Sequence, residues 1–177
     1  MILRQIIATD SATDFWNGFC RAFKNYPELN EQMKALGYPE DAGAVSVLAE
    51  LLVDALHNST SPIYFILDDL YILNQKSLTP MLIFLSRSLP DCVHLILLSR
   101  NQIFSEEERM RLGNLLCEIR VEDLRLEQQE VIMYAQRCCL EAPADELKSL
   151  AALSEGWISM IYLNFKSYVQ NGRWLSI

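Results

Sequence analysis

Glycine is scarce in this sequence, and no glycine lies in a phosphate-binding loop. The glycines are Gly18, Gly37, Gly43, Gly113, Gly156 and Gly172. None of them stands in the pattern Gly-x-x-x-x-Gly-Lys-Ser/Thr, in which backbone N–H groups and a lysine hold the phosphates of a nucleotide. The sequence therefore contains no complete phosphate-binding loop of the P-loop type.

Histidine is also rare, and the cysteines are not spaced for disulfides or for a metal site. His57 and His94 are the only histidines, and neither belongs to a zinc-protease motif. No Gly-x-Ser-x-Gly nucleophile motif is present. The five cysteines are an odd number, and none forms a Cys-x-x-Cys pair. Reduced thiols in a cytoplasm are the expectation that follows.

Positive charge is not concentrated anywhere along the chain. The formal net charge is −8, and no run of lysines or arginines occurs. Since phosphate contacts with nucleic acid need clustered basic residues, we expect no nucleic-acid binding by this chain itself. No apolar stretch approaches the roughly 20 residues of a membrane span. The first residues are too few for a secretory signal peptide, so we expect a cytoplasmic location and no membrane contact.

What the sequence does have is a large apolar fraction arranged in alternating elements. Hydrophobic residues make up 51% of 177 residues, which suffices for a sizeable core. Short apolar runs predict strands at residues 2–8, 63–69, 93–98 and 115–121. Helical spacing predicts helices that end at Pro27, follow Asp41, and span 77–89 and 105–112, with a loop before Asp41. The first of these helices opens on the capping-box pattern of Ser11 and Asp14.

This alternation predicts an α/β fold with a parallel sheet. The runs at 63–67 and 93–98 are continuously apolar, which is typical of strands covered by helices on both faces. After residue 123 the pattern changes to three helices, at 126–140, 144–153 and 156–169, with no strand between them. We therefore predict an α/β domain at residues 1–123 and a small helical subdomain at 124–177.

Polar residues follow two of the predicted strands directly. Asp68 and Asp69 come after one strand, and Ser99 and Arg100 come after the next. Open parallel sheets bind ligands beyond the carboxyl ends of their strands. Two carboxylates and a cation at one edge suit Mg²⁺-phosphate chemistry, in which one acid holds the metal and another orients a water molecule. Paired aspartates after a strand are equally a common turn or cap signal, and this interpretation stays open.

Two other kinds of site fit the sequence less well. A receiver domain also gathers acids at strand ends, but it needs a lysine after a later strand, and residues 115–121 offer none. His94 lies inside an apolar run, so a packed or edge position is the simpler interpretation than a metal ligand.

Five motifs, taken in order, resemble a known family. They are Asp14–Phe23, Ile63–Tyr71, Leu89–Asp91 ahead of Leu95–Arg100, Leu124–Leu126, and Ser154–Trp157. Together they are similar to the nucleotide-binding module of MalT-like, LuxR-type transcriptional regulators, which are signal-transducing ATPases of the STAND class. The resemblance covers nearly the whole chain and implies a P-loop-NTPase-like sheet followed by a helical lid.

The resemblance implies a role for each matching residue. Asp68 would be the Walker B aspartate that binds Mg²⁺, and Asp69 would position the attacking water. Arg100 would be the sensor arginine that contacts the γ-phosphate, with Ser99 beside it in the nucleotide site. The pair Gly156–Trp157 would open a lid helix near the nucleotide base. ATP or ADP with Mg²⁺ would bind the full-length protein.

The missing phosphate loop is a departure from the family. By the resemblance, the first strand and the P-loop would precede Met1. A region that senses a small-molecule inducer and a DNA-binding helix-turn-helix would follow this chain. We therefore expect a fragment that neither binds nucleotide nor hydrolyses ATP in isolation. Because the first strand is central in such sheets, its loss predicts unpaired edges and self-association, or an altered strand order.

Two alternatives to an ATPase fragment stay open. The chain could be a complete interaction or dimerisation module that kept the fold without nucleotide binding. It could also be a distinct hydrolase or kinase that uses Asp68 and Asp69 with a metal.

Overall fold

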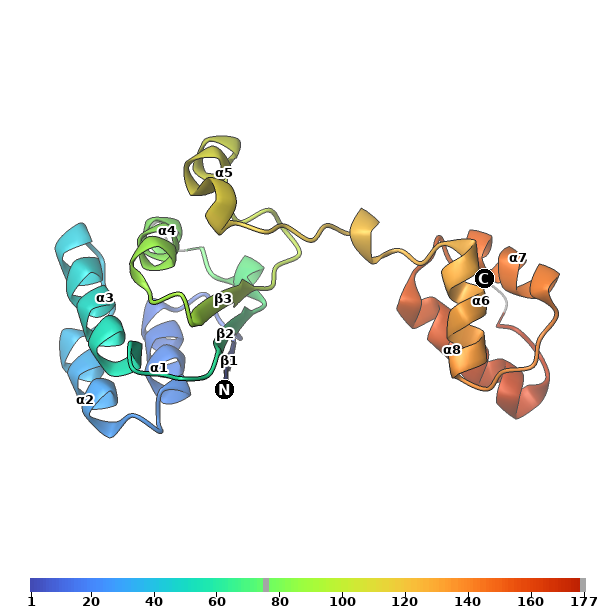
Figure 1. The fold of residues 1–177 in the computed structure, drawn as a ribbon, viewed down its shortest axis with the longest axis horizontal. Coiled ribbons are helices and arrows are strands. Elements are labelled where there is room, and N and C mark those ends of the chain that lie inside the picture. Colours follow the sequence, from blue (N-terminus) through green and yellow to red (C-terminus); the bar gives the residue numbers. More distant parts are fainter. Residues whose placement is uncertain (75–76, 176–177) are drawn as a thin grey trace. The chain divides into compact units, whose positions relative to one another are not determined.

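The structure is a computed structural model that describes residues 1–74 and 77–175. The chain divides into two compact units, Met1–Leu116 and Cys117–Ile177, which are described separately below (Figure 1). The sequence pattern predicts the division after residue 123, which lies inside a short 3₁₀ helix at Glu122–Leu124 and a few residues beyond the observed division. None of the described helices combines the length and the hydrophobicity that a membrane span requires.

The first unit is built on a parallel sheet. Its strands are β1 (Ile2–Ile6), β2 (Ile63–Asp68) and β3 (Val93–Leu97). They lie in the order β1-β2-β3, and Phe65 at the centre of β2 pairs with Leu3 on one side and Leu95 on the other. The α/β class and three of the predicted strands are thereby confirmed. Among the described residues the three strands pair without a gap, so the backbone groups without a strand partner are those on the outer edges of β1 and β3.

The helices of the first unit cover one face of this sheet. In Figure 1 the helices α1 to α4 all lie on one side of the strands. Ile63, Phe65 and Leu67 of β2 point to that side and are buried. On the other side Tyr64 is 39% exposed, and Ile96 of β3 is also exposed. The prediction of a strand buried on both faces is therefore wrong, because a continuous apolar run does not reveal whether helices cover its second face.

Side-chain caps begin several of these helices. The helices of the first unit are α1 (Ala12–Ala22), α2 (Pro27–Leu36), α3 (Ala42–Leu56), α4 (Leu78–Ser88) and α5 (Glu106–Leu112). Ser11 accepts a hydrogen bond from the Asp14 N–H at 3.2 Å and so caps α1. The Asp14 carboxylate, however, accepts from the Thr9 hydroxyl and does not complete a capping box. Ser105 and Glu108 form a reciprocal capping box at the start of α5.

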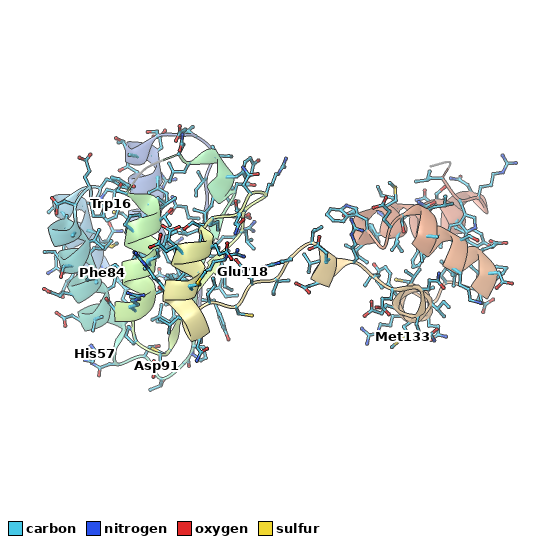
Figure 2. All side chains as sticks on the ribbon, turned by 90° about the horizontal axis from the view of Figure 1, so that it is seen from above. Trp16, His57, Phe84, Asp91, Glu118 and Met133 are labelled. Carbon is cyan, nitrogen blue, oxygen red and sulfur yellow. The ribbon has the colours of Figure 1, made fainter. Side chains whose placement is uncertain are left out.

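Helix α2 occupies the stretch that the sequence pattern assigned to a loop. Pro27 is its first residue, where the missing N–H and the fixed φ of proline cost nothing. Leu29 and Met33 of α2 are buried in the core of the unit. Trp16 of α1, which Figure 2 labels, is buried in the same core, and its indole nitrogen donates to the Met33 carbonyl at 3.2 Å. The loop prediction is therefore wrong, because Pro27 starts a helix where it was expected only to stop one.

The fourth predicted strand, at residues 115–121, is not a strand in the structure. A 3₁₀ helix at Gly113–Leu115 precedes it, and the next residues have no regular structure. Leu116 is half-buried against the core of the first unit, but Ile119 is 70% exposed. A strand needs a neighbour for its backbone groups, and no described strand pairs with this segment. The prediction of a strand at residues 115–121 is therefore wrong, although the apolar pattern of a strand is present.

The second unit is a small helical domain. Its helices are α6 (Gln128–Arg137), α7 (Ala144–Leu153) and α8 (Ile158–Asn171), as the sequence pattern predicts. Its core is formed by Val131, Ala135, Leu140, Leu147, Leu150, Ala151, Ile161 and Phe165. This cluster is separate from the core of the first unit, so each unit has its own hydrophobic centre.

Candidate functional site

The carboxyl ends of β2 and β3 are joined by backbone hydrogen bonds. The Leu98 N–H donates to the Leu67 carbonyl at 2.9 Å, and the Leu70 N–H donates to the Leu98 carbonyl at 3.0 Å. The polar pairs Asp68–Asp69 and Ser99–Arg100 directly follow these bonded residues. The structure therefore brings the two predicted pairs to one edge of the sheet, which we call the strand-end rim.

Asp68 is held by two hydrogen bonds at this rim. Its Oδ1 accepts from the Asp69 N–H at 2.9 Å, and its Oδ2 accepts from the Arg4 guanidinium at 2.6 Å. The Asp68 side chain is 20% exposed, whereas that of Arg4 is 55% exposed. The carboxylate thus lies at the surface end of the sheet with a cation from β1 already against it.

Asp69 forms the turn that follows β2. Its φ of 59° and ψ of 36° lie in the left-handed region, which aspartate tolerates better than most residues. Its carbonyl accepts from the Ile72 N–H at 3.0 Å and starts a 3₁₀ helix at Leu70–Ile72. The alternative interpretation of the paired aspartates as a turn signal is therefore confirmed for the Asp69 backbone. Among residues 1–74 and 77–175, no hydrogen bond to its carboxylate is found.

Ser99 and Arg100 are also engaged within the first unit. The Ser99 hydroxyl accepts from the Asn101 N–H at 3.2 Å. The Arg100 guanidinium lies over the ring of Tyr71, 4.9 Å from its centroid. Tyr71 belongs to the 3₁₀ helix that follows Asp69, so this cation–π contact ties the segment after β3 to the turn after β2.

Sequence reasoning missed two residues near this rim. Arg4 was treated only as part of a strand, although a charged residue in the middle of an apolar strand is itself a signal. Asp10 lies in the loop after β1, and its carboxylate accepts from the Asn74 N–H at 2.7 Å. Asp10 therefore fastens the loop after β1 to the segment after β2. All three strand ends contribute polar side chains, and the sequence indicated only two of them.

The predicted pair Gly156–Trp157 lies in the second unit. Gly156 has a φ of 73°, and its carbonyl accepts from the Leu126 N–H at 2.9 Å. A Cβ at this position would lie 2.4 Å from the Leu126 carbonyl oxygen, so only glycine fits. Trp157 stands directly before α8 and is half-exposed. Packing inside the second unit is sufficient to require this glycine, and its contact with a nucleotide stays a prediction.

The carboxylates of the strand-end rim are of the type that binds Mg²⁺. The oxygens of Asp68 and Asp69 are the donors that Mg²⁺ prefers, and Mg²⁺ needs only one or two protein carboxylates when phosphates and waters complete its shell. Within the part of the chain that the structure describes, no three His, Cys, Asp or Glu side chains are placed to hold a metal by themselves. The glycines with positive φ are Gly37, Gly113, Gly156 and Gly172, and none follows β1, β2 or β3 directly. In the described residues, no glycine-rich turn that could cradle a phosphate therefore follows a strand directly.

Comparison with known proteins adds no family. No protein-family model matches the chain, and no curated protein matches it either.

Proposed function

We propose that this chain is part of the nucleotide-binding, signal-transducing module of an ATP-dependent regulator similar to the MalT-like, LuxR-type proteins. One observation carries the proposal. Asp68–Asp69 and Ser99–Arg100 follow adjacent parallel strands that are hydrogen-bonded at the rim. This is where open α/β sheets bind ligands, and the residue types suit a magnesium-bound phosphate.

In this proposal each of these residues has one role. Asp68 holds Mg²⁺ or its water shell, and Asp69 orients a water molecule from the turn after β2. Arg100 neutralises phosphate charge, and Ser99 contributes a hydroxyl beside it. Gly156 and Trp157, in the second unit, take the role near the nucleotide base that the resemblance implies. ATP with Mg²⁺ supplies the energy for switching in the full-length protein, and this chain lacks the loop that cradles phosphate.

The remaining parts of the proposal concern the longer protein. DNA binding belongs to a helix-turn-helix, and inducer binding belongs to a sensor region, both outside this chain. The location is cytoplasmic. Hydrolysis is not expected from this chain in isolation, because Asp68 and Asp69 have no phosphate cradle opposite them.

A nucleotide-free interaction module is the second candidate. The ion pair between Arg4 and Asp68 favours it, because the Asp68 carboxylate is already neutralised by a side chain of the same unit. The two candidates differ in whether a divalent cation can replace Arg4 at this carboxylate.

Titration of the ¹⁵N-labelled chain with Mn²⁺, a paramagnetic substitute for Mg²⁺, distinguishes the two. The ATPase proposal expects selective broadening of the amide signals around Asp68, Asp69 and Ser99, and loss of that broadening in Asp68→Asn. Asp91→Asn is the matched control, because it removes the same charge from an exposed position just before β3, at the other end of the strand. Broadening that is unchanged in Asp68→Asn, or no local broadening at all, would favour the nucleotide-free module.

A further inference from the structure

The outer edge of β3 carries unpaired backbone groups. The Ile63 N–H donates to the Cys92 carbonyl, and the Leu98 N–H donates to the Leu67 carbonyl. In a parallel ladder the residues that bond to one neighbour alternate along the strand. The even-numbered residues of this strand therefore face β2. The N–H and C=O groups of Leu95 and Leu97 point to the outer edge, where no described strand lies.

This edge lacks the features that usually protect a sheet edge. Natural edge strands carry charged residues, prolines or bulges that prevent pairing with another chain. The opposite edge strand, β1, has Arg4 at its centre. In contrast β3 reads Val-His-Leu-Ile-Leu and contains no lysine, arginine, acid or proline. The edge of β3 is therefore the more receptive of the two.

The same chain contains a strand-like segment that pairs with no described strand. We call residues 115–121 the donor segment. From Cys117 on, its sequence alternates apolar Cys117, Ile119 and Val121 with polar Glu118 and Arg120, which is typical of a strand with one buried face. Leu115, Ile119 and Val121 are exposed in the structure. Covering these three apolar side chains would stabilise the protein.

We propose that the donor segment of one chain adds as a further strand to the β3 edge of a second copy of this chain. Each copy offers one receptive edge and one donor segment, so two copies can exchange strands reciprocally and close as a two-fold dimer. The added strand would satisfy the outward groups of Leu95 and Leu97, and the sheet, with one covered face, accepts a strand with one apolar face. This assembly does not depend on nucleotide binding.

Hydrogen exchange of the full chain over a range of concentrations tests the proposal, with the mass followed by sedimentation equilibrium. We expect a dimer of the 20.3 kDa chain at high concentration. Exchange of peptides that cover residues 93–98 and 115–121 should slow together as the dimer forms. The β1 peptide should not change, because its edge is not used.

A double variant tests the donor segment directly. Ile119→Asp with Val121→Asp places two charges on the apolar side of the segment and should weaken dimerisation at least about tenfold, since two buried aliphatic side chains are lost. Ile119 and Val121 lie outside the helices and strands of the monomer, so the circular dichroism spectrum should stay unchanged. Leu124→Asp is the matched control, because Leu124 is 59% exposed and lies just outside the segment. Its dimerisation should stay within about twofold of that of the unaltered chain.

Several outcomes would overturn the proposal. A monomer at every concentration would exclude the dimer. A dimer that the double variant leaves unaffected would exclude the donor segment. Slow exchange of both peptides at all concentrations would mean that the segment pairs within its own chain. Protection of residues 2–6 instead of 93–98 would assign the interface to the other edge.

Discussion

Gln5 is a polar residue buried beneath the first helix. Its Nε2 donates to the Phe15 carbonyl at 2.7 Å, and its Oε1 has no hydrogen-bond partner in the described part of the chain. Gly18 of α1 lies directly against this amide, and a Cβ there would be 2.5 Å from Nε2. The glycine thus makes room for a buried hydrogen bond between β1 and α1.

Gly18→Ala should therefore destabilise the first unit by about 1–3 kcal/mol, although alanine favours helix formation. Gly43→Ala is the control, because Gly43 also lies in a helix and its added Cβ would meet only the exposed Asp41 carboxylate, at 3.2 Å. The Asp41 oxygen that this Cβ meets also caps α3, so we expect the variant to stay within about 1 kcal/mol of the unaltered chain, with the helix preference of alanine offsetting a small shift of the cap. Urea unfolding measures the free energy of unfolding of both variants. Equal stability of the two variants would contradict this account of Gly18.

The ion pair between Arg4 and Asp68 has little to do with stability. The Arg4 side chain is more than half exposed, and exposed pairs contribute about 0–1 kcal/mol. The pair matters because it determines what else can approach Asp68. A cation that binds there must displace a guanidinium, and this competition is what the Mn²⁺ titration measures.

At the scale of elements, α3 depends on a single side-chain cap. The Asp41 carboxylate accepts from the Ala44 N–H at 2.9 Å at the first turn of the 15-residue helix. Val45, Leu48, Ala49, Leu52 and Leu56 of this helix are buried. Loss of the cap should therefore lower the stability of the whole first unit.

Asp41→Ala should lower the free energy of unfolding by about 1 kcal/mol, because a backbone N–H loses its partner and a negative charge leaves the helix N-terminus. Asp54→Ala removes the same charge from an exposed position near the end of α3. There the acid opposes the helix dipole, so its removal should leave stability unchanged or slightly higher. Thermal unfolding compares the two variants. An equal or larger loss in Asp54→Ala would contradict the assignment of the effect to the Asp41 cap.

The elements that could be predicted from the sequence are those with a local signal. Strands β1, β2 and β3 and the helices after Ser11, Asp41 and Ser105 carry apolar periodicity or caps that a short window contains. Helix α2 was missed because Pro27 is compatible with both a stop and a start. The donor segment has the right pattern, but a strand exists only when a neighbour pairs with it.

The candidate site was predictable for a similar reason. Asp68–Asp69 and Ser99–Arg100 were expected together because parallel strands end at the same edge, and the structure bears out that placement. The contact of Arg4 with Asp68 could not be predicted, because it depends on the order of the strands and on a side chain that reaches along the sheet. The exposure of the second face of the sheet could not be predicted either, because it depends on where all the helices pack.

At the scale of the whole molecule, two separate cores imply two separate unfolding reactions. Leu48 is fully buried in the first core and Leu147 is buried in the second. Truncation of a buried leucine to alanine costs about 2–5 kcal/mol. If the units unfold independently, each truncation should lower the stability of its own unit only.

Hydrogen exchange measured in increasing urea, at a dilution that keeps the chain monomeric, reports each unit through its own peptides. Leu48→Ala should accelerate exchange in α1 to α4 and leave α6 to α8 unchanged, and Leu147→Ala should do the reverse. Each variant is the control for the other, because the same chemical change is made in the two cores. If both variants accelerated exchange in both units, the chain would unfold as one cooperative body. That result would exclude two independently folding units.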